Sequence, residues 1–148
     1  MDLSQFKSKP SAKVLGIITF VGEVKSIPTQ NGGQFQVQEF GMECFFGTHE
    51  KPYIETIAFQ ATSKPTRKKE NDTWVEAPSY LEQFSEKPLK VGEAISVTLS
   101  LGGYVKAESG YAIPKITLEY LFRLKQDEAT LVKSLLDIVK QAREAAIL

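Results

Sequence analysis

Apolar and polar residues follow a strand-like pattern most densely in the first third of the chain. β-branched and aromatic residues reach the density typical of strands over residues 13–27 and 34–46. The polar break between these segments contains Asn31, Gly32 and Gly33, which tolerate the positive φ that a tight reversal requires. The pattern predicts a long antiparallel hairpin, and we expect the rest of the chain to pack against it.

Three glycines interrupt the strands of this hairpin. Gly16, Gly22 and Gly41 each remove a side chain and add backbone freedom, so we expect them to mark bulges or sharp bends. Long strands that bend at glycines suit a small closed barrel.

Alternation with a period of two predicts a third strand over residues 53–61 and a fourth over residues 94–101. The fourth has the cleanest pattern, with apolar side chains on one face at Ile95, Val97, Leu99 and Leu101. We expect the Gly-Gly pair at residues 102–103 to end the fourth strand, and we expect residues 104–109 to form a polar turn. A fifth strand is predicted over residues 111–122, where Pro114 indicates an edge position or a bulge.

The segment between the third and fourth strands changes character twice. Residues 63–72 contain only polar residues and one proline, which predicts an exposed loop, and this loop is basic. Trp74 follows the loop. Tyr80, Leu81 and Phe84 then fall at helical spacing and predict one or two helical turns.

From residue 127 the apolar period lengthens to that of a helix, which predicts an amphipathic helix over residues 127–146. Asp127 and Glu128 lie at its N-terminal end, where the helix dipole favours acidic side chains. Its apolar stripe comprises Leu131, Leu135, Ile138, Ala142 and Ala145, widened by Val132, Leu136 and Val139. This face must be buried, and two alternatives stay open: packing on the barrel, or pairing with the same helix of a second copy.

Composition limits the classes of protein that this chain can represent. A length of 148 residues with 42% hydrophobic residues suits one domain, which we expect over residues 13–124, preceded by a flexible arm over residues 1–12 and followed by the helix over residues 125–148. Eighteen basic and eighteen acidic residues cancel, so any affinity for a polyanion must come from a local patch.

Targeting and cysteine usage suggest a compartment. Cys44 is the only cysteine, which excludes an intrachain disulfide and a cysteine-rich metal site and favours a reducing environment. The N-terminus lacks the apolar run of a signal peptide, and no segment approaches a membrane span. We expect a soluble cytoplasmic protein that does not bind membranes.

Three strands, a short helix and two further strands are the element order of the OB-fold. The expected fold is therefore mainly β: a five-stranded OB-fold Greek-key barrel with a short helix between strands 3 and 4 and a C-terminal amphipathic helix. Between residues 13 and 123 the chain also resembles bacterial and phage single-stranded DNA-binding proteins. The resemblance lies in residues 22–24 (GEV), 33–40 (GQFQVQEF), 57–59 (IAF), 91–97 (VGEAISV) and 101–104 (LGGY).

The resemblance implies a non-enzymatic protein that coats single-stranded DNA in replication or recombination, as a homo-oligomer and without a cofactor. Single-stranded RNA stays open as the alternative ligand. Bacterial members typically end in a glycine-rich linker with an acidic tip that recruits enzymes, whereas this chain ends in a predicted helix, which puts such recruitment in doubt.

Binding a single strand requires cations for the phosphates and flat rings on which bases stack. The candidate cations are Lys25, Lys64, Arg67, Lys68, Lys69, Lys106 and Lys115. The candidate rings are Phe40, Phe46, Tyr53, Trp74, Tyr104 and Tyr111, of which Trp74 is the strongest. Core packing is the alternative for every ring, and we expect it at Phe20, Phe35, Phe59 and Phe84. The alternative to nucleic-acid contact for the basic loop is an exposed segment whose charges only keep it solvated.

Catalytic chemistry has little support in the sequence. His49, the only histidine, lies in a polar turn and is expected at the surface, and with Cys44 it cannot complete a zinc site. Glu39 and Glu43 are expected to be solvated. Two other functions stay open: a protein-interaction module, and a small enzyme whose pocket would be lined by Glu39, Glu43 and His49.

Overall fold

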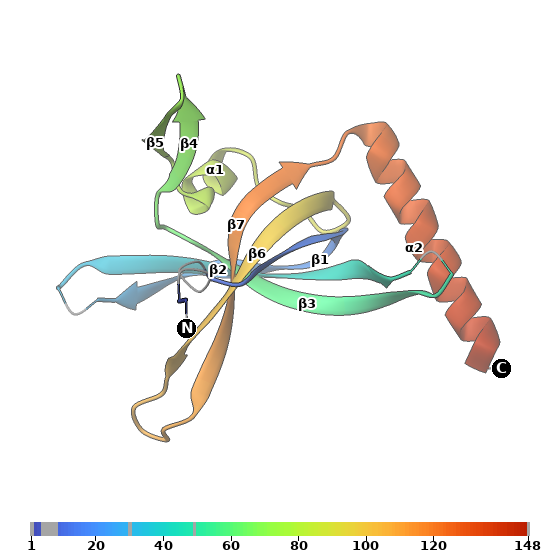
Figure 1. The fold of residues 1–148 in the computed structure, drawn as a ribbon, viewed down its shortest axis with the longest axis horizontal. Helices are drawn as coiled ribbons and strands as arrows, with labels where there is room; N and C mark the ends of the chain where they lie inside the picture. Colours follow the sequence, from blue (N-terminus) through green and yellow to red (C-terminus); the bar gives the residue numbers. More distant parts are fainter. Residues whose placement is uncertain (1, 4–8, 30, 49, 148) are drawn as a thin grey trace.

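The computed structural model describes the chain except residues 1, 4–8, 30, 49 and 148 and the side chain of residue 147. Five strands form a closed barrel in the order β1-β2-β3-β7-β6, which confirms the expected barrel class (Figure 1). These strands are β1 (Ser11–Pro28), β2 (Gln34–Gly47), β3 (Pro52–Thr62), β6 (Ala94–Val105) and β7 (Ala112–Arg123). Neighbours are antiparallel except β3 and β7, whose parallel pairing closes the barrel at Gln60 and Thr117.

Strand β1 pairs with β2 along one edge and with β6 along the other. It begins at Ser11, and the Leu101 N–H donates to the Pro10 carbonyl at 2.9 Å, so the end of the expected arm is already attached to β6. The rest of that arm falls largely on residues 4–8, outside the described part of the chain.

The glycines of β1 serve two different purposes. Gly22 lies within a register shift between Val21 and Val24, which confirms the predicted bend there. Gly16 lies in regular pairing, so a bulge at this position was the wrong expectation. A Cβ on Gly16 would collide with the Glu43 carbonyl oxygen, so this glycine permits a close approach of β1 to β2.

A second register shift in β1, between Ile18 and Phe20, reverses which residues face inward. Ile18 is fully buried, but Phe20 is exposed, contrary to the expected core position. One extra residue in a strand moves the following side chains to the other face of the sheet. Phe35 is only partly buried, whereas Phe59 and Phe84 lie in the core as expected.

The core is centred on Phe40, which is 1% exposed. Its ring stacks on Phe59 and meets Phe84 edge-on, each with 5.4 Å between ring centroids. Phe84 belongs to helix α1 (Tyr80–Glu86), which covers one end of the barrel and confirms the short helix expected after the third strand. Ser79 caps this helix by accepting a hydrogen bond from the Glu82 N–H at 3.2 Å.

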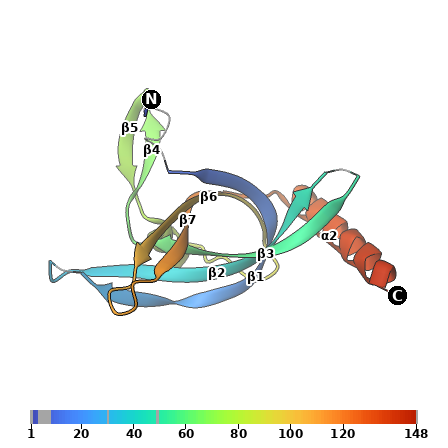
Figure 2. The same cartoon turned by 60° about the horizontal axis from the view of Figure 1, so that its bottom comes forward.

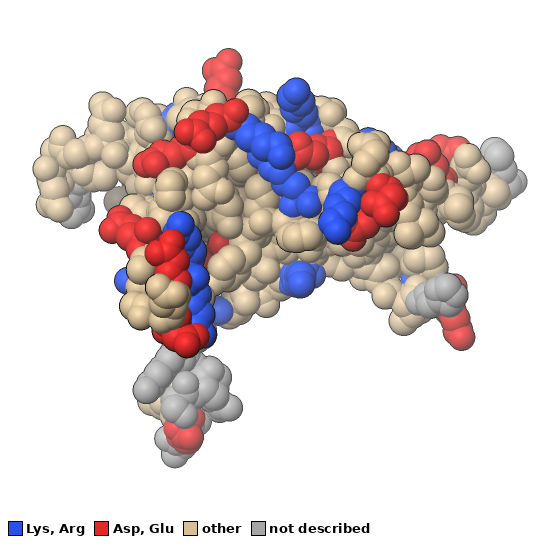
Figure 3. All heavy atoms as spheres, turned by 90° about the horizontal axis from the view of Figure 1, so that it is seen from above, with Lys and Arg blue, Asp and Glu red and all other residues tan. Residues whose placement is uncertain are grey.

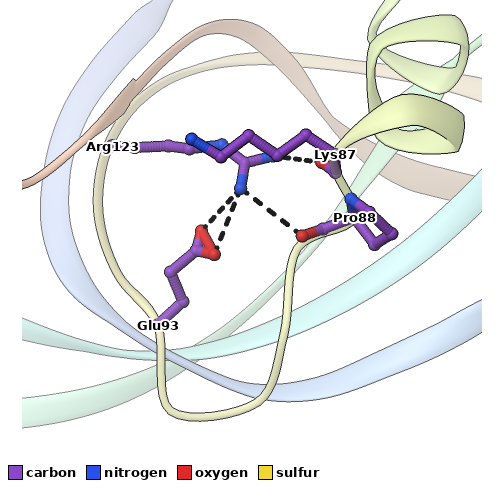
Figure 4. A network of polar contacts seen from close by, with 4 residues as sticks. All are labelled: Lys87, Pro88, Glu93 and Arg123. Carbon is purple, nitrogen blue, oxygen red and sulfur yellow. Dashed lines mark hydrogen bonds and ion pairs between the residues drawn. The ribbon is translucent and has the colours of Figure 1, made fainter.

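Arg123 at the end of β7 holds the loop that follows α1 (Figure 4). Its guanidinium donates to the Lys87 carbonyl, to the Pro88 carbonyl at 3.4 Å and to the Glu93 carboxylate at 3.1 Å. The same group lies 6.0 Å from the Phe84 ring centroid. This network ties α1 to the barrel and thereby positions the segment that precedes α1.

The β6–β7 hairpin continues past the barrel as an arm, here called the β6–β7 arm (residues 102–115) (Figure 1). The expected break at residues 102–103 was wrong, because Gly103 pairs with Pro114 inside the arm. A Cβ on Gly103 would lie 2.7 Å from the Ile113 carbonyl oxygen, so glycine is needed for strand contact here. Leu101 is exposed because β6 leaves the barrel at this residue.

Residues 63–72 do not form the predicted loop. Strands β4 (Thr66–Glu70) and β5 (Thr73–Ala77) pair as a separate two-stranded sheet, the β4–β5 hairpin. Asn71 and Asp72, with φ of 48° and 63°, form the two-residue turn between them. Positive φ at both central residues matches the twist of a hairpin, and asparagine and aspartate tolerate it. The hairpin projects from the barrel beside α1 (Figures 1 and 2).

Helix α2 (Gln126–Ile147) confirms the predicted C-terminal helix and packs on the outside of the barrel. Val132 and Leu136 are buried against Ala94 and its neighbours, and Lys140 Nζ lies 2.8 Å from the Glu43 carboxylate. Packing on the barrel therefore accounts for one side of the apolar face. No helix of the described residues is long and apolar enough to cross a membrane.

Replacing Leu136 by alanine should lower the free energy of unfolding by about 2–4 kcal/mol, because its side chain is 3% exposed and would leave a cavity. The matched change Leu135→Ala should cost well under about 1 kcal/mol, since that neighbour is 44% exposed. Urea denaturation of both variants measures the difference. Equal losses would contradict the observed orientation of α2.

The Cys44 thiol should resist modification in the folded protein, because Cys44 is fully buried and burial raises its pKa to about 12. An aromatic disulfide reagent at about pH 8 should label the urea-unfolded chain rapidly and the native chain only at its rate of unfolding. Rapid labelling without denaturant would contradict this burial.

Candidate nucleic-acid interface

The β4–β5 hairpin brings a ring and two cations to one face. The strand register places Lys69 opposite Trp74 and Arg67 opposite Glu76. Directly opposed residues of an antiparallel pair share a face, with Cβ atoms about 4.5–5.5 Å apart. Trp74 is 56% exposed, so its indole is available to a ligand beside Lys69, on the face that also carries Arg67 and Glu76.

Acidic side chains offset part of the hairpin's charge. Lys68 Nζ lies 3.0 Å from the Glu70 carboxylate, and Lys69 Nζ lies 3.9 Å from the Asp72 carboxylate. All four side chains are more than half exposed, so these pairs are weak and can exchange for other anions. Acidic and basic side chains are correspondingly interspersed over the face seen in Figure 3.

Lys64 and Arg67 differ from their neighbours. Within the described part of the chain, no acidic side chain lies within 4.0 Å of the charged nitrogens of either residue. Both residues are exposed, so their charges are available to a polyanion, with Glu76 opposite Arg67 across the hairpin.

A cleft of about 570 Å³ lies between the base of the hairpin and β7. Lys64, Arg67 and Lys68 line its hairpin side, and Tyr120 of β7, 56% exposed, lines the other. Tyr80 also lines the cleft, where its hydroxyl accepts a hydrogen bond from the Leu121 N–H at 3.0 Å. Burial raises the pKa of Tyr80, so this group stays protonated at neutral pH.

The β6–β7 arm carries a second group of predicted site residues. Lys115 Nζ lies 5.7 Å from the Tyr104 ring centroid, a cation–π contact on the exposed arm. Lys106 and Tyr111 flank the turn and are held by a 2.9 Å hydrogen bond from the Lys106 N–H to the Tyr111 carbonyl. Both tyrosine side chains are exposed.

The remaining candidates are spread over the β1–β2 and β2–β3 hairpins. Lys25 is exposed on β1, where it pairs with Val37. Phe46 and Tyr53 stack on each other at 5.9 Å, and Phe46 also packs against the core. Phe40 was wrong as a stacking candidate, because its ring is enclosed by Phe59 and Phe84.

The predicted residues thus form several groups on separate arms, and the hairpin group is the densest. Tyr120 and Phe122 were missed, although both are exposed on β7. Tyr120 lies opposite Thr98, but Leu118 lies opposite Leu99. Strand β7 therefore has one extra residue between these two pairs. The extra residue moves Tyr120 to the outer face, and nothing in the local alternation reveals this shift.

The carboxylates considered for catalysis do not converge with the histidine in the described structure. Glu43 is paired to Lys140, and Glu39 lies four residues away on β2, opposite Gln60. His49 lies outside the described residues. Among the residues that the structure describes, no three metal-binding side chains form a cluster.

No protein-family model matches this chain, and no curated protein matches it. Solved structures that resemble it include single-stranded DNA-binding proteins. The small protein from Streptomyces coelicolor is 12% identical, with a TM-score of 0.40, over 79% of this chain and 95% of that chain. The mitochondrial protein Rim1 from S. cerevisiae is 11% identical, with a TM-score of 0.42, over 80% and 98%.

A Plasmodium falciparum protein in complex with single-stranded DNA is 14% identical, with a TM-score of 0.42, over 80% of this chain and 97% of that chain. At these identities and scores the likeness assigns no ligand to this chain. The function must be argued from its own residues.

Proposed function

We propose that this protein binds single-stranded DNA without enzymatic activity, by stacking bases on exposed rings and pairing phosphates with lysine and arginine. The main support is Trp74, an exposed ring that shares one face of the β4–β5 hairpin with Arg67 and Lys69. The cleft beneath the hairpin adds further cations and Tyr120.

A few stacking and phosphate contacts can supply the free energy of binding even in a protein of zero formal charge. One base stacked on an aromatic ring contributes about 1–3 kcal/mol, and each phosphate contact adds a salt-dependent increment. Screening confines a local field to about 10 Å at moderate salt, so distant acidic residues hardly oppose the hairpin cations.

The proposed contacts involve phosphates and ring faces, which carry little sequence information. Such non-specific binding would suit a coating role on single strands in replication or recombination, which is part of this proposal. RNA offers the same phosphates and bases, so a matched RNA oligonucleotide is the natural competitor. The alternative is a protein-interaction module, in which changing the hairpin cations would leave any DNA affinity unaltered.

Trp74 is the only tryptophan, so its fluorescence reports directly on the proposed contact. Adding an oligo-dT of about 16 nucleotides, the upper site size of one such barrel, should quench the emission as bases stack on the indole. Trp74→Ala should weaken binding about 5- to 150-fold, the equivalent of one lost stack. Fluorescence anisotropy of labelled oligo-dT measures the affinity.

Phe20→Ala is the matched control for Trp74→Ala, because Phe20 has the same exposed fraction, 56%, but lies on β1 and belongs to none of the proposed binding groups. Its affinity should equal that of the wild type. Unchanged Trp74 emission, together with no binding even at low salt, would refute the proposed function.

The double variant Arg67→Gln/Lys69→Gln should reduce the salt dependence of binding. If each cation contacts one phosphate, the slope of log K against log salt should become shallower by about 1.4, at about 0.7 per contact with a single strand. Anisotropy titrations over a series of NaCl concentrations measure this slope.

Lys125→Gln/Lys133→Gln removes the same charge from exposed positions beside or on α2, away from the hairpin (Figure 1). This control should keep the wild-type slope. An equal change in both double variants would show a response to overall charge, and would count against a phosphate path at the hairpin.

A further inference from the structure

Helix α2 carries two apolar stripes, and the barrel covers only one of them. Ala129, Val132, Leu136 and Val139 face the barrel and are partly or fully buried. The second stripe comprises Leu131, Leu135, Ile138, Ala142 and Ala145, all exposed. Leu131 and Ile138 are each 61% exposed, which is costly for large aliphatic side chains in water.

The second stripe has the spacing of a helix–helix seam. Its members recur at intervals of four, three, four and three residues, which is a heptad pattern, over about 21 Å of helix. Such a pattern keeps one continuous line of apolar side chains facing a partner helix.

The borders of this stripe are uncharged through its central part. At about 100° per residue, the barrel-facing stripe borders it on one side and Ser134 and Gln141 border it on the other. Lys133, Asp137 and Lys140 project from the far side of the helix. A second helix could therefore approach the stripe without desolvating a charge in the centre of the contact.

We propose that this stripe pairs with the same stripe of a second copy of the chain, with the two helices antiparallel. An isologous two-fold contact needs a self-complementary surface, and one line of leucine, isoleucine and alanine satisfies that requirement. This inference does not depend on nucleic-acid binding.

The charge distribution along α2 selects the antiparallel orientation. Asp127 and Glu128 lie close to the stripe at its N-terminal end. Parallel pairing would bring the acidic ends of both copies together. Antiparallel pairing keeps them apart, and it also aligns the helix dipoles favourably.

A hollow of about 670 Å³ beside the stripe extends the apolar surface towards β3. Tyr53, Ile54, Ile138, Val139 and Ala142 contribute to its lining, and charged residues of both signs surround them. The charged part of the lining is balanced, with Lys51, Lys140 and Arg143 against Glu43, Glu50 and Glu55. A partner helix therefore finds additional apolar contact at this end.

Pairing through α2 would leave the β4–β5 hairpin free, because hairpin and helix lie on opposite sides of the barrel (Figures 1 and 2). A dimer would present two copies of the hairpin on one assembly. Two linked sites bind a long polymer more tightly than one, through effective concentration.

Sedimentation equilibrium of the full chain tests the pairing. At about 100 µM, above the dissociation constant of micromolar complexes, the wild type should have at least twice the 16.5 kDa mass of one chain. Leu131→Glu/Ile138→Glu should reduce the mass by breaking the seam, and it should keep the circular dichroism spectrum of the folded wild type because both side chains are exposed in the single chain.

Val105→Glu/Tyr111→Glu is the control, since it places two glutamates at exposed apolar positions of the β6–β7 arm. Its mass should equal that of the wild type. A wild-type chain that remains monomeric overturns the proposal, and so does an assembly that survives the Leu131→Glu/Ile138→Glu change.

The orientation has its own readout. In an antiparallel pair centred on Ile138, residue 131 of one copy lies opposite residue 145 of the other, so a mixture of Leu131→Cys and Ala145→Cys chains should form mainly the mixed disulfide on mild oxidation. A predominance of disulfides between two copies of the same variant would overturn the antiparallel arrangement.

Discussion

Hydrogen bonding of β1 along both of its edges is the constraint on which the rest of the structure depends. β1 joins β2 and β6, and the parallel contact of β3 with β7 then closes the ring. Closure leaves no free sheet edge in the barrel. It also requires a close approach at Gly16, where any side chain would meet the Glu43 backbone.

A barrel this small cannot contain strands of 12 to 18 residues along their whole length. The excess length of β1, β6 and β7 leaves the barrel as paired arms, which carry exposed rings and lysines. The β4–β5 hairpin adds another projection, held beside α1, whose position depends on Ser79 and Arg123. The rigid core thus positions surfaces that contribute little to its own stability.

The local pattern of apolar and polar residues was sufficient to predict the order of the barrel strands and the helices. Apolar alternation and helical spacing predicted all five barrel strands and both helices, and the composition of residues 29–33 predicted the first reversal. The same pattern singled out Trp74 and the cations beside it as candidates, which stay a prediction. It failed for the β4–β5 hairpin, because an exposed two-stranded sheet needs no apolar face and its Asn71-Asp72 turn resembles an ordinary polar loop.

The sequence by itself determined the five barrel strands, the two helices, their order and the presence of an apolar face on α2, because these depend on residues close together in the chain. The tertiary structure alone decided that Phe40 is enclosed, that Phe20 and Tyr120 face outward, and that only one stripe of α2 is covered. Register shifts and barrel closure set those outcomes through contacts between distant strands. A shift of one residue reverses the face of every side chain that follows, and local periodicity carries no record of it.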